Sequence, residues 1–486
     1  MLKTTPAAKR RPNRLLPQAA LFLLGLLFAG ASAAEGLPDA VAKVTRRLGV
    51  PESALGIIVR EIGSETPLVT LNPDTPRNPA STVKIITTLA ALEELGPTYS
   101  WPTEVFITAP VRDSVLDGDL IIKGYGDPYL MTEEFWKMVQ ALRRQGLQTI
   151  NGDLVVDNSY FAVQEGDPGE FDNRPFHAYN VLPDALLVNL KAVYFHFYPA
   201  SDGKSVLIKT EPELPNLNIE NRLIPIAGPC GGYQHGVAMT VPDPVLADRV
   251  IFEGRYAMSC GHYVFARSVL TPEAFAYGAF KALWEQSGGV LTGTVKAGVA
   301  GPELRPWLTW NSRPLAEILR YVNKFSNNVM TRQILLTLGA ELVGEPGTVD
   351  GGIQAVQQYL EKNGISSAPL VLENGSGLSR NERVTPQLMA DALLRGNANP
   401  FMPEFIASLS IIGMDGTARN RLKRGEEKGH AHVKTGTLDN VSAIAGYVDA
   451  KSGRRFVVVG LLNHSEAQYR TGEQIWNALI QWAFTL

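Results

Sequence analysis

The chain has 486 residues, with 45 lysine and arginine residues against 48 aspartate and glutamate residues, so its net charge is -3 at pH 7. This length predicts two or three domains. The acidic balance argues against a nucleic-acid partner, and neither the spacing of the seven histidines nor any glycine-rich phosphate loop indicates a metal or a cofactor.

Residues 1–33 have the composition of a targeting segment. Five basic residues and no acidic ones accompany an apolar run from Leu15 to Ala29, which Ala31-Ser32-Ala33 follows. The run is shorter than the roughly 20 residues of a membrane span. We therefore expect a cleaved signal peptide, an exported protein and no stable membrane anchor. Loss of this segment takes the net charge from -3 to -8.

The remaining chain predicts a split domain with an insertion. Helices are expected at residues 38–48, 81–95, 272–286, 314–324, 326–338, 352–362 and 474–484. Strands are expected at residues 55–60, 67–71, 432–437, 441–448 and 455–462. The two early and three late strands predict one antiparallel sheet, built from residues 34–100 and 271–486. Residues 101–270 are rich in short β segments and turn residues, and predict a separate, mainly β insertion.

The insertion holds the chain's two cysteines, Cys230 and Cys260. In an exported protein such a pair favours a disulfide over two free thiols. The sequence alone does not decide between these states.

Ser81 and Lys84 are the first candidates for chemistry. Three residues apart on a helix, they lie on one face, so a nucleophile has a base beside it. The helix N-terminus would also favour an oxyanion at Ser81. The spacing alone is weakly specific, because Ser201 and Lys204 repeat it in a segment of turn composition.

Two further motifs follow in the chain. Ser326-Asn327-Asn328 begins a predicted helix, where serine and asparagine also serve as N-caps. The run from Lys434 to Thr437, Lys-Thr-Gly-Thr, lies on a predicted strand and by itself would suit a solvated strand end. Each motif alone has an ordinary structural interpretation.

Together and in this order, the three motifs resemble those of penicillin-binding proteins and serine β-lactamases. The gap of about 245 residues between Ser81 and Ser326 resembles the class C low-molecular-mass penicillin-binding proteins, which are D-alanyl-D-alanine carboxypeptidases and endopeptidases. Supporting stretches lie at residues 124–128, 157–161, 374–380 and 413–417.

The resemblance implies an α+β fold: a split β-lactamase/transpeptidase-like domain, with an antiparallel sheet flanked by helices and a mainly β inserted region. It implies a periplasmic serine hydrolase that acts on peptidoglycan stem peptides, is inhibited by β-lactam antibiotics and needs no cofactor. The alternatives are a serine β-lactamase and a non-catalytic peptidoglycan-binding scaffold. The long insertion argues against the first, and the intact motifs argue against the second.

The resemblance also implies residue roles. Ser81 would be the nucleophile, Lys84 its base and Ser326 a proton relay, with the backbone N–H groups of Ser81 and Thr437 as the oxyanion hole. The residues expected to bind substrate are Asn328, Lys434, Thr435, Thr437, Asp157 and Arg380. Asp157 and Arg380 would contact the third stem residue, although a turn aspartate and a solvated arginine are equally good interpretations. Asn374 stands where members of the family often have Asp, and Asp439 stands where some of them carry Gln.

Overall fold

The computed structural model describes residues 34–163, 166–232 and 236–486. The expected signal peptide, residues 1–33, lies outside this part of the chain. No helix within the described residues is both long and apolar enough to cross a membrane.

A seven-stranded sheet forms the centre of the split domain, in the order β1-β3-β2-β22-β21-β20-β19. Its strands are β1 (Ala34–Glu35), β2 (Leu55–Glu61), β3 (Val69–Leu71), β19 (Ser410–Ile411), β20 (Ala431–Leu438), β21 (Val441–Asp449) and β22 (Arg455–Asn463). All neighbours pair antiparallel except β1 and β3. The predicted pairing of two early with three late strands is confirmed, and two-residue strands extend both edges.

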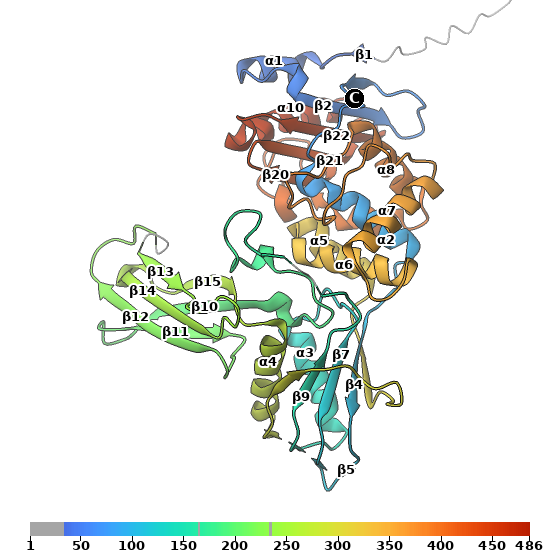
Figure 1. The fold of residues 1–486 in the computed structure, drawn as a ribbon. Helices are drawn as coiled ribbons and strands as arrows, with labels where there is room; N and C mark the ends of the chain where they lie inside the picture. The colour runs from blue at the N-terminus through green and yellow to red at the C-terminus, as the bar shows by residue number, and fades with distance from the viewer. Residues whose placement is uncertain (1–33, 164–165, 233–235) are drawn as a thin grey trace, which may run out of the picture. The chain divides into compact units, whose positions relative to one another are not determined.

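Helices cover both faces of this sheet (Figure 1). One face carries α1 (Asp39–Arg47) and α10 (Gly472–Phe484). The other faces α2 (Lys84–Glu94), α5 (Leu315–Phe325), α6 (Asn328–Leu342), α7 (Val349–Lys362), α8 (Pro386–Ala398) and α9 (Met402–Ser408). Alternation along β22 serves both cores: Val457, Val459 and Leu461 face the large helical layer, whereas Val458 and Leu462 pack with α10. Helices α8 and α9 are absent from the prediction.

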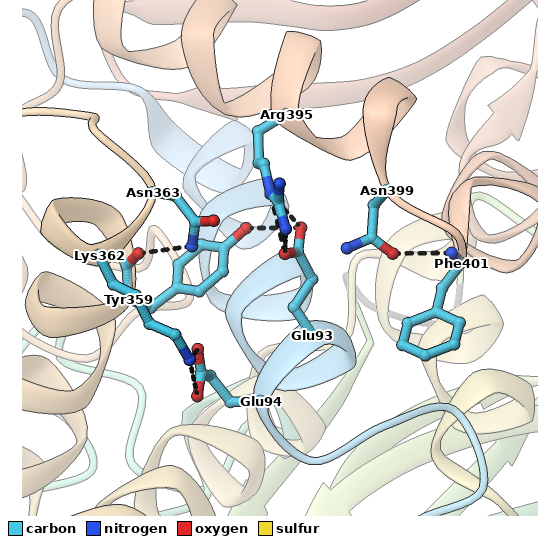
Figure 2. A network of polar contacts seen from close by, with 8 residues as sticks. All are labelled: Glu93, Glu94, Tyr359, Lys362, Asn363, Arg395, Asn399 and Phe401. Carbon is cyan, nitrogen blue, oxygen red and sulfur yellow. Dashed lines mark hydrogen bonds and ion pairs between the residues drawn. The ribbon is translucent and has the colours of Figure 1, made fainter.

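Helix α2 runs through the middle of the large helical layer, and nearly all its residues are buried. At its C-terminal end the nearly buried carboxylate of Glu93 accepts hydrogen bonds from Arg395 Nε on α8, at 2.9 Å, and from the Tyr359 hydroxyl on α7, at 2.8 Å. Figure 2 shows how these side chains converge on Glu93. The contacts join three helices and hold the end of α2 that lies opposite Lys84.

Glu93→Gln should lower the free energy of unfolding by about 1–3 kcal/mol. The substitution removes the negative charge that pairs with Arg395 and replaces one acceptor oxygen with an NH2 group. Arg395 is 36% exposed, so solvent screens part of the loss. The neighbouring Glu94 is a matched control, because its partner Lys362 is 68% exposed and such pairs contribute about 0–1 kcal/mol. Thermal unfolding midpoints test this. A drop for Glu94→Gln that equals or exceeds the drop for Glu93→Gln contradicts the expectation.

The inserted region contains the remaining sheets. Their orders are β17-β9-β7-β4-β18, β16-β8-β6-β5, β11-β10-β15 and β12-β14-β13. The strands are β4 (Pro102–Ile107), β5 (Val111–Arg112), β6 (Val115–Leu116), β7 (Leu120–Gly124), β8 (Thr149–Ile150), β9 (Leu154–Asp157), β10 (Ala192–Pro199), β11 (Val206–Glu211), β12 (Asn218–Ile226), β13 (Val237–Thr240), β14 (Arg249–Ala257), β15 (Tyr263–Ser268), β16 (Val290–Leu291), β17 (Val295–Ala297) and β18 (Leu308–Asn311). Cys230 and Cys260 form a disulfide within this region.

The expected end of the insertion at residue 270 is wrong. Strands β16, β17 and β18 lie after that residue, yet they pair with β8, β9 and β4. Helix α4 (Pro272–Gln286) shares a core with α3 (Thr132–Arg144), where Phe280 packs against Phe135. The insertion therefore extends to about residue 311, and its described residues include the α-helices α3 and α4.

Candidate active site

Ser81 lies in a 3-10 turn, Ala80–Val83, immediately before α2. The sequence predicted it at the first turn of the helix itself. Ala80 has a φ of +44°, a left-handed conformation that is strained for alanine. Its N–H donates to Asn78 Oδ1 at 2.8 Å, and Asn78 exchanges two hydrogen bonds with the Asn463 side chain at the end of β22. These contacts fix the turn that presents the Ser81 hydroxyl.

Lys84 is fully buried at the start of α2. Its Nζ donates to Ser81 Oγ at 3.1 Å, to Asn328 Oδ1 at 2.8 Å and to the carbonyl oxygen of Ser376. Burial, reinforced by the charge of Lys434, holds the pKa of Lys84 well below its usual value. A lysine that loses its proton readily, in contact with a serine hydroxyl, has the geometry of a nucleophile with its base.

The Ser326 motif lies where α5 meets α6. Ser326 ends α5 in a left-handed conformation, with a φ of +59°. Asn327, the middle residue, is the N-cap of α6, because its side chain accepts the N–H of Met330 at 3.0 Å. The Ser326 hydroxyl is thus left for another partner, and Lys434 Nζ donates to it at 2.8 Å.

Strand β20 contains the third motif, Lys434 to Thr437, and lies beside the turn that holds Ser81. Lys434 is fully buried, and burial lowers its pKa to about 7. At Gly436 a Cβ would lie 3.0 Å from the Ser81 nitrogen and 2.8 Å from the Pro79 oxygen, so only glycine lets the strand approach this closely. Thr435 Oγ1 donates to Thr417 Oγ1 at 2.7 Å, and Thr437 is exposed. Three motifs remote in sequence therefore meet at one place.

The glycine-rich loop of residues 373–382 completes the site. Its Ser376 carbonyl contacts Lys84, and a Cβ on Gly377 would lie 2.1 Å from the Ala80 oxygen. Sequence reasoning used part of this loop as support for the resemblance but missed Glu382, which is fully buried behind it. The local sequence from Arg380 to Arg383 is polar throughout, so no sequence signal separates this carboxylate from solvated neighbours.

The two predicted contacts for the third stem residue are placed differently. Arg380 lines a cavity of about 590 Å³, pairs with Asp439 at 3.0 Å and lies 4.7 Å from the ring centre of Phe171. Asp157 is fully buried, and its oxygens accept hydrogen bonds from Ser159 and from the N–H of Ala300. These contacts hold Asp157 inside the insertion, and its contact with the third stem residue stays a prediction.

Within the described parts of the chain, no three histidine, cysteine or acidic side chains are grouped to hold a metal ion. The three motifs bring together the hydroxyls of Ser81 and Ser326, the amines of Lys84 and Lys434 and the amide of Asn328. This donor set suits acyl transfer through a serine.

Known proteins similar to this chain include D-alanyl-D-alanine carboxypeptidases. The family model described as the D-Ala-D-Ala carboxypeptidase 3 (S13) family matches residues 37–485. A D-alanyl-D-alanine carboxypeptidase from Actinomadura sp. (strain R39) is 29% identical over 413 residues, which cover 82% of this chain and 76% of that protein. The D-alanyl-D-alanine carboxypeptidase DacB of Haemophilus influenzae is 26% identical over 440 residues, 89% of each chain.

Solved structures show the same fold. Penicillin binding protein 4 (dacB) from Haemophilus influenzae matches with a TM-score of 0.79 and 23% identity, over 93% of this chain and 100% of that one. Its complex with a β-lactam matches with a TM-score of 0.74. The predicted α+β fold and the predicted serine-type carboxypeptidase class are confirmed. The match over nearly the whole described chain shows that this protein belongs to the D-Ala-D-Ala carboxypeptidase 3 (S13) family.

Proposed function

We propose that this carboxypeptidase cleaves its substrate through an acyl-enzyme on Ser81, with Lys84 as the base. The observation that carries the assignment is the 3.1 Å contact between Lys84 Nζ and Ser81 Oγ, with the lysine fully buried. In its neutral form Lys84 can take the hydroxyl proton as Ser81 Oγ attacks the carbonyl of the penultimate D-alanine.

The other residues then act in turn. The backbone N–H groups of Ser81 and Thr437 stabilise the oxyanion, and Ser326 passes a proton to the departing amine. Lys434, with the hydroxyls of Thr435 and Thr437, binds the terminal carboxylate. Asn328 holds a substrate amide. The C–N bond breaks, D-alanine leaves with the proton, and water hydrolyses the ester to free Ser81.

We further propose that the substrate is the stem peptide of periplasmic peptidoglycan, and that the enzyme also opens cross-links between stems. Both bonds present a D-alanine carbonyl to the nucleophile, so one site serves both. Arg380, beside the cavity and paired with Asp439, contacts the side chain of the third stem residue.

Digestion of purified cross-linked and uncross-linked cell-wall fragments, followed by mass analysis, tests the substrate. Loss of D-alanine from uncross-linked stems together with conversion of dimers to monomers supports both activities. Intact dimers contradict the endopeptidase, and intact pentapeptides contradict the carboxypeptidase.

A labelled penicillin that stays bound to Ser81 separates this enzyme from a β-lactamase, which would release it rapidly.

The second-order rate constant for acylation should fall as pH rises through about 7. Burial lowers the pKa of Lys434 to about 7, so above that pH the free enzyme loses the charge that binds the carboxylate of substrate or penicillin. Lys434→Arg keeps its charge and should lose this descending limb, which stopped-flow acylation across pH measures. A wild-type profile that does not fall above neutral pH would show that Lys434 does not bind the carboxylate as a cation.

A further inference from the structure

The loop of residues 373–382 touches both the proposed nucleophile and the proposed base. Its Ser376 carbonyl accepts a hydrogen bond from Lys84 Nζ, and its Gly375 carbonyl accepts one from Thr87 Oγ1 at 2.9 Å, one turn further along α2. Gly377 lies against the backbone of Ala80, where a Cβ would come within 2.1 Å of the carbonyl oxygen. A shift of this loop would therefore move the amine of Lys84 relative to Ser81.

Glu382 holds that loop from behind. The side chain is fully buried, and its Oε1 accepts the N–H groups of Glu373, Asn374 and Gly375 at 3.2, 3.1 and 2.9 Å. Three converging N–H groups suit an ionised oxygen. Oε2 has no hydrogen-bond partner among the residues that the structure describes. Burial raises the pKa of this carboxyl, whereas the three N–H groups and the charge of Lys84 act in the opposite direction.

We propose that Glu382 is a positioning residue for Lys84. Its carboxylate fixes the backbone of residues 373–375, and this backbone in turn places the carbonyl oxygen of Ser376 against the Lys84 amine. The inference rests on the proposed role of Lys84 as the base. Glu382 itself touches neither Ser81 nor the substrate site.

The charge of Glu382 adds an effect that a purely structural residue would not have. Lys84 is faced by Lys434 from β20, by Arg332 from α6 and by Glu382 from the loop. Burial and the two cations lower the pKa of Lys84, whereas the charge of Glu382 raises it. Arg332 also faces Glu382, and its charge remains when Glu382 is neutralised. Loss of the carboxylate charge should thus release the Lys84 proton at lower pH.

Two substitutions separate anchoring from charge. Glu382→Gln keeps an oxygen to accept the three N–H groups but removes the charge, so we expect the wild-type plateau rate of acylation, with its ascending limb moved to lower pH. Glu382→Ala removes the acceptor, and a misplaced amine should lower the plateau rate by about 10- to 100-fold. Glu427→Gln is the matched control, because Glu427 is also buried but is bonded to Gln481. It should change neither quantity.

Acylation by a fluorescent penicillin across acid and neutral pH, on full chains with wild-type circular dichroism, gives both readouts. An unmoved ascending limb in Glu382→Gln overturns the proposal, and so does a wild-type plateau in a folded Glu382→Ala. If Glu382→Ala does not fold, the position of the ascending limb in Glu382→Gln alone decides whether the proposal holds. Persistent adduct formation by Ser81→Ala would instead overturn the proposed function, so the two failures are distinguishable.

Discussion

Ser81→Ala forms no covalent penicillin adduct and releases D-alanine at least about 10⁴-fold more slowly than the wild type, because the acyl group then has no oxygen to bind. Replacing a serine nucleophile alone typically lowers kcat about as much as replacing all the catalytic residues that act with it. The substitution should leave the fold intact. Ser81 is partly exposed, and its hydroxyl is not the only partner of Lys84, which keeps Asn328 and Ser376.

The chain supplies its own control for this experiment. Ser201 and Lys204 repeat the spacing of Ser81 and Lys84, but they are exposed in the turn between β10 and β11. Ser201→Ala should acylate at the wild-type rate. Intact-mass measurement after incubation with penicillin, followed by peptide mapping, identifies the labelled serine. An adduct on Ser81→Ala at the wild-type rate would place the nucleophile elsewhere.

The sheet and the three motifs were predictable because each leaves a strong local signal. Strands β21 and β22 are nine residues long and mostly apolar, whereas β20, eight residues long, alternates apolar and polar residues over its first four positions; both patterns indicate strands. Strands β16, β17 and β18 have only two to four residues, too few for a period to emerge. Their pairing across the insertion is a long-range property, and the end of the insertion was therefore misplaced.

The same limit applies to single charged residues. Asp157 ends an apolar strand, and Arg380 and Glu382 lie in a polar segment, but the structure buries Asp157 and Glu382 fully and leaves Arg380 half-exposed. What decides their environments is the partner each meets: backbone N–H groups for Asp157 and Glu382, and Asp439 with Phe171 for Arg380. Those partners are distant in sequence or lie on the backbone, so residue type alone does not reveal them.

Lys84→Gln should slow acylation by about 10²- to 10⁴-fold, the usual contribution of a general base. An amide cannot take the Ser81 proton, but its N–H groups can donate to Asn328 Oδ1 and to the Ser376 carbonyl, so the buried acceptors stay paired. The low pKa of Lys84 predicts a second effect, on the pH dependence of acylation. In the wild type the rate rises with pH as the lysine loses its proton, and this ascending limb should vanish in Lys84→Gln.

Single-turnover acylation across pH measures both effects, and Lys204→Gln in the exposed copy of the motif is the control that should match the wild type. A lower rate with the ascending limb intact would mean that another group is the base and that Lys84 only orders the site. A wild-type rate would exclude both roles. The combined outcome, a slow acylation of Ser81 that has lost its ascending limb, requires the buried amine beside Ser81 to be the proton acceptor, since among the described residues no other titrating side chain donates to or accepts from Ser81 Oγ.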